Sequence, residues 1–586
     1  MLIERHQVGE AVVSAAREDF THRIGGQVRS MSRAGRMTTF DWQMIADEFL
    51  DYLGALSTEA SGLGTPEAEA ALKDAAEAAA GAVAYAAYHP HCGFHVFLEY
   101  VNFGMGYDPG DDAPEESVTP REWTDALCLA VLGNKAERHG EAFHFARQKF
   151  AEKERGTPGG ELATGLMAVF LGDTGDDEEE YPPSAGARLA AVDAALDRVR
   201  ARARETGEPL GERPDGVALR TLRALAAEDR EAFDAGLAEL LVGHGAMQGP
   251  SAPARSLLPL LPMALAAVAY RTLGWAPAVR TDYLPQVLLT GFETPGPRVA
   301  GFGRDRRPDA VAALAAGPLV VDRPARPQTE VSDIEQVYRE TMRKAFTPVD
   351  GQPLRAWWLA QVMGDQERLF QWREDDPGRT TDAQLAGLRL ASRAGAALFR
   401  VALAEPGTET EVAIAGRTLR YPAERSEKAC AVTWRKAVAL ALITGVREDL
   451  APLVLSGAAF ARPNGSAFDA YPEALYAYLG GTDAEPAARR ALEQAEKAKT
   501  WGFAMPPTVL LSQLVEGDEE SFNLALADAL ETHRAHYQVA DRAESPDASV
   551  DLDILGLACH ARRRGWAVRV ESRYLPADIL RAAEPF

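Results

Sequence analysis

Four side chains that can bind zinc lie close together in the stretch HPHCGFH. Imidazole nitrogens and thiolate sulfurs are the ligands that zinc prefers. Structural zinc sites draw their ligands from two separated pairs, and the sequence has no second cluster downstream. A turn between a helix and an extended segment therefore fits this stretch better than a metal centre, and we expect no bound metal. The four side chains are His89, His91, Cys92 and His95.

No other group of residues in the sequence predicts an active site. The sequence lacks a P-loop lysine, an H-E-x-x-H helix and a G-x-S-x-G elbow. Cys559 and His560 are neighbours on a predicted helix, so their side chains diverge and cannot pair as nucleophile and base. We therefore predict a protein that is not an enzyme and has no cofactor. A metal-dependent enzyme that uses His89, His91 and His95 remains an alternative.

Two stretches of the chain occur twice, far apart. LAAEDREAFDAGLAELLVGH, residues 225–244, matches LVEGDEESFNLALADALETH, residues 514–533, at eight of twenty positions without a gap. GWAPAVRTDYLP, residues 274–285, returns as GWAVRVESRYLP, residues 565–576. Alanine, the strongest helix former, is abundant, and apolar residues in the repeated stretches have helical spacing. These features predict a mainly α fold with two tandem homologous α-helical domains.

The predicted domains are residues 1–300 and 335–586. A linker is predicted at 301–334, because this stretch is rich in proline, glycine and arginine and has little helical pattern. Each domain is expected to include a small β-hairpin or extended segments. TEVAIAGRTLRYP, residues 410–422, alternates around Ala415 and Gly416 and predicts a hairpin, with the aromatic stretch 94–107 as its counterpart in the first domain.

The repeated GWA…YLP pattern predicts the same corner in both domains. The glycine ends a helix, the tryptophan packs back onto that helix, and the proline begins the next helix. In the second domain Asp518 is expected to cap the helix before this corner. The recurring histidines are expected at helix ends, where a cation meets the helix dipole favourably. The residues with predicted structural roles are Gly274, Trp275, Tyr283, Phe233 and His244, and Gly565, Trp566, Tyr574, Phe522 and His533.

The chain is strongly acidic, with a formal net charge of -24 at pH 7. Such a charge repels nucleic acid and anionic membranes and attracts basic partners. Two acidic loops, at 107–117 and 172–184, have no equally acidic equivalent in the second copy. They are either solvated connections or a surface that meets a basic partner. The partner-binding candidates are Asp111, Asp112, Asp173, Asp176, Asp177, Glu178, Glu179 and Glu180.

A cytoplasmic location is expected from three features of the chain. The first ten residues contain Glu4, Arg5 and Glu10 and lack the apolar run of a signal peptide. The longest uncharged apolar stretch, residues 256–270, is too short to span a bilayer. The four cysteines are far apart, which is typical of free thiols in a reducing compartment. Because one chain already contains two copies, we expect a monomer, with a dimer as the alternative.

Residues 521–538 and 565–580 carry a resemblance to a known family. Phe522-Asn523, Ala529-Leu530-Glu531 and His533, followed by Gly565 and Tyr574-Leu575-Pro576, resemble the immunity protein 49 family of bacterial polymorphic-toxin systems. The resemblance implies a mostly helical protein that binds and neutralises a protein toxin in the producing cell. Toxins of such systems are often nucleases, whose basic grooves suit an acidic inhibitor. A helical scaffold or regulatory protein without a toxin partner is the alternative.

Overall fold

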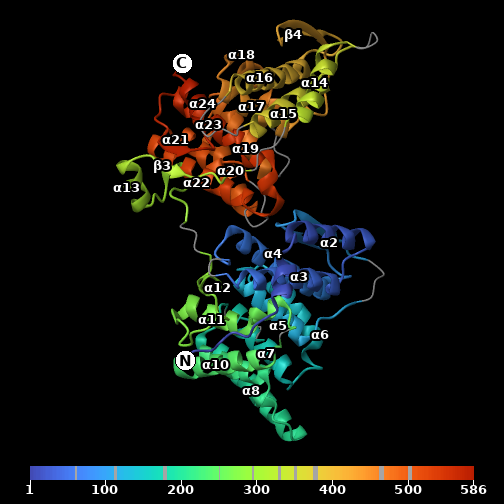
Figure 1. Ribbon diagram of the computed structural model, residues 1–586, viewed down its shortest axis with the longest axis vertical. Helices are drawn as coiled ribbons and strands as arrows, with labels where there is room; N and C mark the ends of the chain where they lie inside the picture. The colour runs from blue at the N-terminus through green and yellow to red at the C-terminus, as the bar shows by residue number, and fades with distance from the viewer. Residues whose placement is uncertain are drawn as a thin grey trace. The chain divides into compact units, whose positions relative to one another are not determined.

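The chain folds into two compact units, Met1–Thr294 and Pro295–Phe586. The computed structural model describes residues 1–59, 62–110, 115–175, 181–249, 251–292, 296–326, 331–348, 353–373, 381–460, 467–498 and 505–585. Helices dominate both units, and the strands are short (Figure 1). The prediction of a mainly α fold is confirmed.

The first unit is built around the long alanine-rich helix α4. The unit contains α1 (Glu10–Arg17), α2 (Phe20–Ala34), α3 (Thr39–Leu56), α4 (Pro66–Tyr88), β1 (Phe94–Leu98), β2 (Phe103–Tyr107), α5 (Pro120–Leu132), α6 (Gly140–Ala151), α7 (Pro158–Leu166), the π-helix η1 (Met167–Leu171), α8 (Ala185–Thr206), η2 (Leu210–Glu212), α9 (Pro214–Ala226), α10 (Arg230–Ala246), η3 (Ala254–Leu257), α11 (Leu260–Leu273) and α12 (Gln286–Thr290). The Thr65 hydroxyl caps α4 by accepting from the amide of Ala68 at 3.1 Å. Because alanine side chains are small, α3, α5 and α6 can all pack closely against α4.

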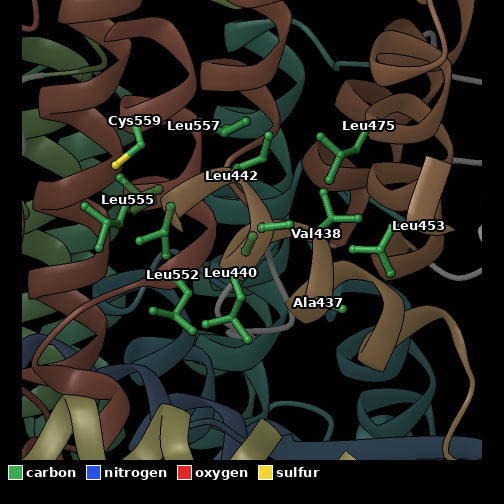
Figure 2. Close-up of a cluster of buried hydrophobic side chains, with 14 of the residues drawn as sticks. Ala437, Val438, Leu440, Leu442, Leu453, Leu475, Leu552, Leu555, Leu557 and Cys559 are labelled. Atoms are coloured by element: carbon green, nitrogen blue, oxygen red, sulfur yellow. The ribbon is translucent and has the colours of Figure 1, made fainter. Parts of the chain in front are cut away.

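The second unit has its core between α17 and α23. It contains η4 (Gly301–Gly303), α13 (Pro308–Ala316), β3 (Leu319–Val321), α14 (Ser332–Phe346), α15 (Trp357–Trp372), α16 (Asp382–Leu403), β4 (Glu409–Ile414), β5 (Arg417–Pro422), α17 (Ala431–Thr444), α18 (Arg447–Phe460), α19 (Ala467–Leu479), α20 (Glu485–Ala498), α21 (Thr508–Glu516), α22 (Glu519–Tyr537), η6 (Ala540–Glu544), η7 (Pro546–Ala548), α23 (Leu552–Arg563), β6 (Val570–Ser572) and α24 (Ala577–Ala582). Figure 2 shows leucines of α17 and α23 with Leu453 of α18 and Leu475 of α19 in one apolar cluster. Burial of this apolar surface is the main force that holds the unit together.

Each unit has a β-hairpin whose last tyrosine anchors it to a helix end or loop. β4 and β5 pair antiparallel and turn at Ala415 and Gly416, which both have positive φ, as a two-residue hairpin turn requires. β1 and β2 pair in the same way in the first unit. The Tyr107 hydroxyl donates to the carbonyl of Met37, and the Tyr421 hydroxyl donates to the carbonyl of Ala345, each at 2.7 Å. The hairpin predicted at 410–422 is thus confirmed.

The predicted corner occurs in both units. Gly274 and Gly565 both have positive φ, +68° and +89°, at the ends of α11 and α23. The tryptophan ring meets a phenylalanine of an earlier helix, and the Trp566 ring also contacts its own helix, since the Arg564 guanidinium at the end of α23 lies 4.5 Å from the ring centroid. The ring centroids lie 5.8 Å apart for Phe233 and Trp275 and 5.6 Å apart for Phe522 and Trp566. The corner tryptophan therefore connects the glycine-terminated helix to the helix before it.

The prediction of a linker at 301–334 does not hold for 301–326. These residues form η4, α13 and β3, and β3 pairs in parallel with β6, with Val320 opposite Glu571. The composition of the stretch suggested a linker because its short elements have little pattern of their own. They are stabilised by packing on α21, α22 and β6, which lie some 200 residues further along the chain.

The first unit contains a counterpart of the β3–β6 pairing at its amino terminus. Leu2 forms a parallel bridge with Arg280, which lies in the extended part of the first corner, and the amide of Ile3 donates to the Arg280 carbonyl at 3.0 Å. The sequences that pair are also similar, since LIER at 2–5 corresponds to VVDR at 320–323. β3, which pairs with the extended part of the second corner, is thus equivalent to residues 2–5 in the first unit.

One segment of the described chain is long and apolar enough to cross a membrane, Ala254–Leu273, and 61% of its most apolar window is buried inside the structure. Met263, Leu265 and Ala267 of α11 are almost fully buried, and α11 packs against α5. This burial is what a core helix shows.

Candidate functional site

One of the predicted partner-binding acids, Asp173, can be placed in the structure. It follows the π-helix η1, whose last turn ends at Gly172 with φ of +70°. The other candidates lie outside the described residues: Asp111, Asp112, Asp176, Asp177, Glu178, Glu179 and Glu180. π-helical turns occur often at functional sites, so the position of Asp173 directly after one is notable.

Asp173 is held in place by basic side chains. Its carboxylate lies 2.6 Å from Nδ1 of His144 and 3.8 Å from the guanidinium of Arg147. Its other oxygen accepts a hydrogen bond of 3.0 Å from the amide of Gly175. The carboxylate is mostly shielded, and it therefore orients the start of the acidic segment more than it presents a free charge.

A hollow of about 490 Å³ opens beside Asp173. Apolar side chains of η1 form part of its lining, and the aromatic ring of Tyr181 is 76% exposed. Its carboxylates come from two positions around the start of α6, and with Asp173 they make the lining acidic. The lining residues are Glu137, Gly140, Glu141, His144, Met167, Leu171, Asp173 and Tyr181. An acidic hollow with an exposed aromatic ring suits a lysine or arginine side chain, through ion pairing and cation–π contact.

The glutamates of this hollow are not among the partner-binding residues predicted from the sequence. Glu137, Glu141 and His144 are spaced by four and three residues, the spacing of one helix face. That pattern is a usable signal, but in so acidic a chain it has many equivalents. These residues line the hollow because η1 lies close to the start of α6 in the fold, and no local sequence pattern indicates that packing.

A second hollow, of about 290 Å³, lies in the second unit. It is lined by Phe302, Tyr478, Thr482, Asp483, Ala484, Glu485, Val515 and Glu516. The Tyr478 hydroxyl lies 3.0 Å from Nε2 of His560 and accepts a hydrogen bond of 2.9 Å from Arg564. The lining contains three carboxylates, and that of Glu485 already pairs at 2.6 Å with Arg489, whose guanidinium also lies over the Phe302 ring.

The side chains of the stretch HPHCGFH have separate contacts in the structure. His89 is buried and stacks on Tyr85 with ring centroids 4.5 Å apart, while His91 binds Glu115 at 3.0 Å. Cys92 is exposed, and His95 lies on β1 against Gly104. Within the described part of the chain, no group of three or more His, Cys, Asp or Glu side chains could hold a metal ion. The stretch forms a turn between α4 and β1, as the turn interpretation predicts.

His244 and His533 lie at the helix ends where the sequence places them, but their burial disfavours the charged form of the ring. Burial lowers the pKa of His533 to about 4, and burial also lowers the pKa of His244. Each ring instead packs edge-on against the tyrosine of the corner, at 5.5 Å for Tyr283 and 5.1 Å for Tyr574. Burial therefore works against the charged cap that the sequence predicts, because the corner shields the imidazole from water.

The comparison with protein families decides the identity of the chain. A family model described as immunity protein 49 matches residues 58–288 and, separately, residues 377–579, which together make up more than half of the chain. The chain belongs to the immunity protein 49 family. Neither curated proteins nor solved structures gave a match to it.

The two segments that match the immunity protein 49 family share their buried contacts. Trp123 and Trp434 are both fully buried, and each indole nitrogen donates at 2.9 Å to a backbone carbonyl, that of Phe143 and that of Leu453. The family match in the second unit ends at 579, just after the corner, and in the first unit it ends at 288, at the same point of the fold. The family pattern thus coincides with the helical framework and its corner.

Proposed function

We propose that this chain is an immunity protein that neutralises a protein toxin by binding it stoichiometrically and covering its active site. Membership of the immunity protein 49 family carries this proposal. The predicted mechanism is steric and electrostatic, so the chain itself performs no chemical step. This agrees with the sequence, in which no catalytic motif was recognised.

The charge of the chain supports a basic partner. A net charge of -24 speeds the encounter with a positively charged protein and favours its retention. The acidic hollow beside Asp173, with the exposed ring of Tyr181, offers one place where a basic side chain of the toxin can bind. A nuclease toxin fits best, because its substrate groove is basic. We further propose that the chain acts in the cytoplasm as a monomer.

Co-expression with the toxin encoded by the neighbouring gene tests the proposal. The chain is expected to restore growth of cells that produce the active toxin, and to co-purify with an inactive variant of that toxin. A folded but unrelated acidic helical protein, expressed to the same level, serves as the control. If cells die although the chain is folded and abundant, and no toxin co-purifies, the chain does not neutralise that toxin. That result would favour the scaffold alternative.

A further inference from the structure

The strap, defined here as residues 296–317, covers one face of α22 in the second unit. Val299, Ala310 and Leu314 of the strap are buried in the core that also contains Leu524 and Ala527 of α22. α13, which forms the end of the strap, lies beside α22 (Figure 1). A helix face that would otherwise be exposed is therefore part of the core.

Two arginines of the strap pair with carboxylates of α22 and its cap. Arg298 binds Asp528 at 2.7 Å and Glu531 at 2.7 Å. Arg306 binds the α22 cap residue Asp518 and, at 2.8 Å, Glu520. Forked guanidinium groups make their strongest pairs with carboxylates in this way. The strap is thus an arginine-bearing segment seated on an acidic helix.

The first unit keeps most of these carboxylates without the arginines. In the gapless match of 225–244 with 514–533, Asp229 corresponds to Asp518, Glu231 to Glu520, and Glu239 to Asp528. Glu231 and Glu239 are exposed. Glu239 forms an ion pair with Arg220 at 3.5 Å, which joins two half-exposed side chains and is correspondingly weak. Val242 takes the place of Glu531 and is 53% exposed.

The face of α10 that corresponds to the strap-covered face of α22 is open. We define the α10 face as Glu231, Ala232, Ala235, Glu239 and Val242, which lie on one side of the helix by their spacing and are all exposed. Their counterparts Ser521 and Leu524 are fully buried. Small side chains on this face allow another backbone to approach closely. The same fold therefore covers this surface in one unit and leaves it free in the other.

We propose that the α10 face binds an arginine-bearing segment of the toxin, in the manner in which the strap binds α22. This inference rests on the proposed function. One arginine pairs with Glu239 and a second with Glu231, as Arg298 and Arg306 pair with their counterparts in the second unit. An apolar side chain of the toxin covers Val242, where the second unit has a carboxylate instead.

Charge reversal on the α10 face tests this inference. The double variant Glu231→Lys/Glu239→Lys is expected to weaken binding of the inactive toxin about 100-fold, because two charge-assisted pairs become repulsive. Ala235→Arg, at the centre of the face, is expected to block the segment sterically with a similar loss. Both changes lie at exposed helix positions, where lysine and arginine are good helix formers. Calorimetric titration of the full chain with the toxin gives the affinities.

Glu205→Lys is the matched control, because Glu205 is exposed at the end of α8 and lies outside the α10 face. It is expected to change the affinity less than threefold. Equal affinity of wild type and both α10 variants would overturn this inference and leave the proposed function standing. No binding by the wild type would overturn both. Light scattering of the wild type and of Ala235→Arg tests a third outcome. If the wild type is a dimer and Ala235→Arg is a monomer, the α10 face binds a second copy of the chain, and the inference is overturned.

Discussion

At the scale of single residues, the recurring histidines show what burial does to a side chain that the sequence presents as a cation. His533 lies between Tyr537 and Tyr574, and its Nδ1 is 3.8 Å from the carboxylate of Asp551. Burial lowers the pKa of His533 to about 4 and outweighs the opposing influence of Asp547. The sequence reveals the position of the imidazole at a helix end, but the charge depends on the corner that folds over it.

The stability of α22 is therefore expected to depend on pH. Because the pKa of His533 is lower in the folded state than its ordinary value of 6.5, the neutral ring stabilises the fold above pH 6.5, and this contribution is lost as the pH falls toward 4. The loss is about 3 kcal/mol for this group. His533→Phe keeps the aromatic contacts and is expected to remove that part of the pH dependence, measured by hydrogen exchange of α22 amides between pH 7 and pH 4.

His22→Gln is the control for this measurement, because the His22 side chain is 77% exposed. It is expected to leave the exchange of α22 as in the wild type. If His533→Phe shows the full pH dependence of the wild type, the neutral buried state of His533 is wrong.

At the scale of elements, the parts predictable from the sequence are those whose signals are local. The Asp518 cap accepts from the amide of Ser521 at 3.1 Å, as its position before an apolar stripe indicates. The turn at Ala415 and Gly416 and the glycine ends of α11 and α23 are likewise local features. The strap was missed, because Arg298 finds Asp528 across some 230 residues of chain. Such a pairing is determined by packing, which a local pattern does not record.

The corner glycine is expected to be more important than its open surroundings suggest. A Cβ at Gly565 would meet nothing within 4 Å, but the φ of +89° is strained for an L side chain. Gly565→Ala should therefore lower the free energy of unfolding of the second unit by about 1 kcal/mol through backbone strain alone. Chemical denaturation measures this change.

Gly364→Ala provides the opposite result in the same unit. Gly364 lies inside α15, also with open space around its Cβ position but without a positive φ. Alanine there should raise the free energy of unfolding by roughly 0.5–1 kcal/mol. Equal effects of the two substitutions would contradict the role assigned to the left-handed helix end.

Arg298 is expected to stabilise the packing of the strap on α22. Arg298→Gln removes the charge-assisted pairs that Arg298 makes with Asp528 and Glu531. The free energy of opening of the strap amides, measured by hydrogen exchange, should fall by about 2 kcal/mol. Arg343→Gln is the control, because Arg343 pairs with Glu340 within α14, outside the strap and α22. It should leave the protection of the strap amides unchanged.

At the scale of the whole molecule, the chain carries the immunity protein 49 framework in two units. The family model matches once in each unit, and the corner, the hairpin tyrosine and the buried tryptophan recur with the same contacts. We infer that an internal duplication gave rise to the two units. The two units differ in what covers the α10 and α22 faces. The strap covers α22 in the second unit, and we expect the uncovered α10 face of the first unit to bind the partner.

The most direct test of the central claim is a titration of toxin activity with the purified chain. Increasing amounts of the full chain are added to a fixed amount of active toxin, and the remaining activity is followed on the toxin's own substrate. Neutralisation by stoichiometric binding predicts a linear loss of activity that reaches zero at one chain per toxin. Activity that persists unchanged at a tenfold excess of folded chain would contradict the account.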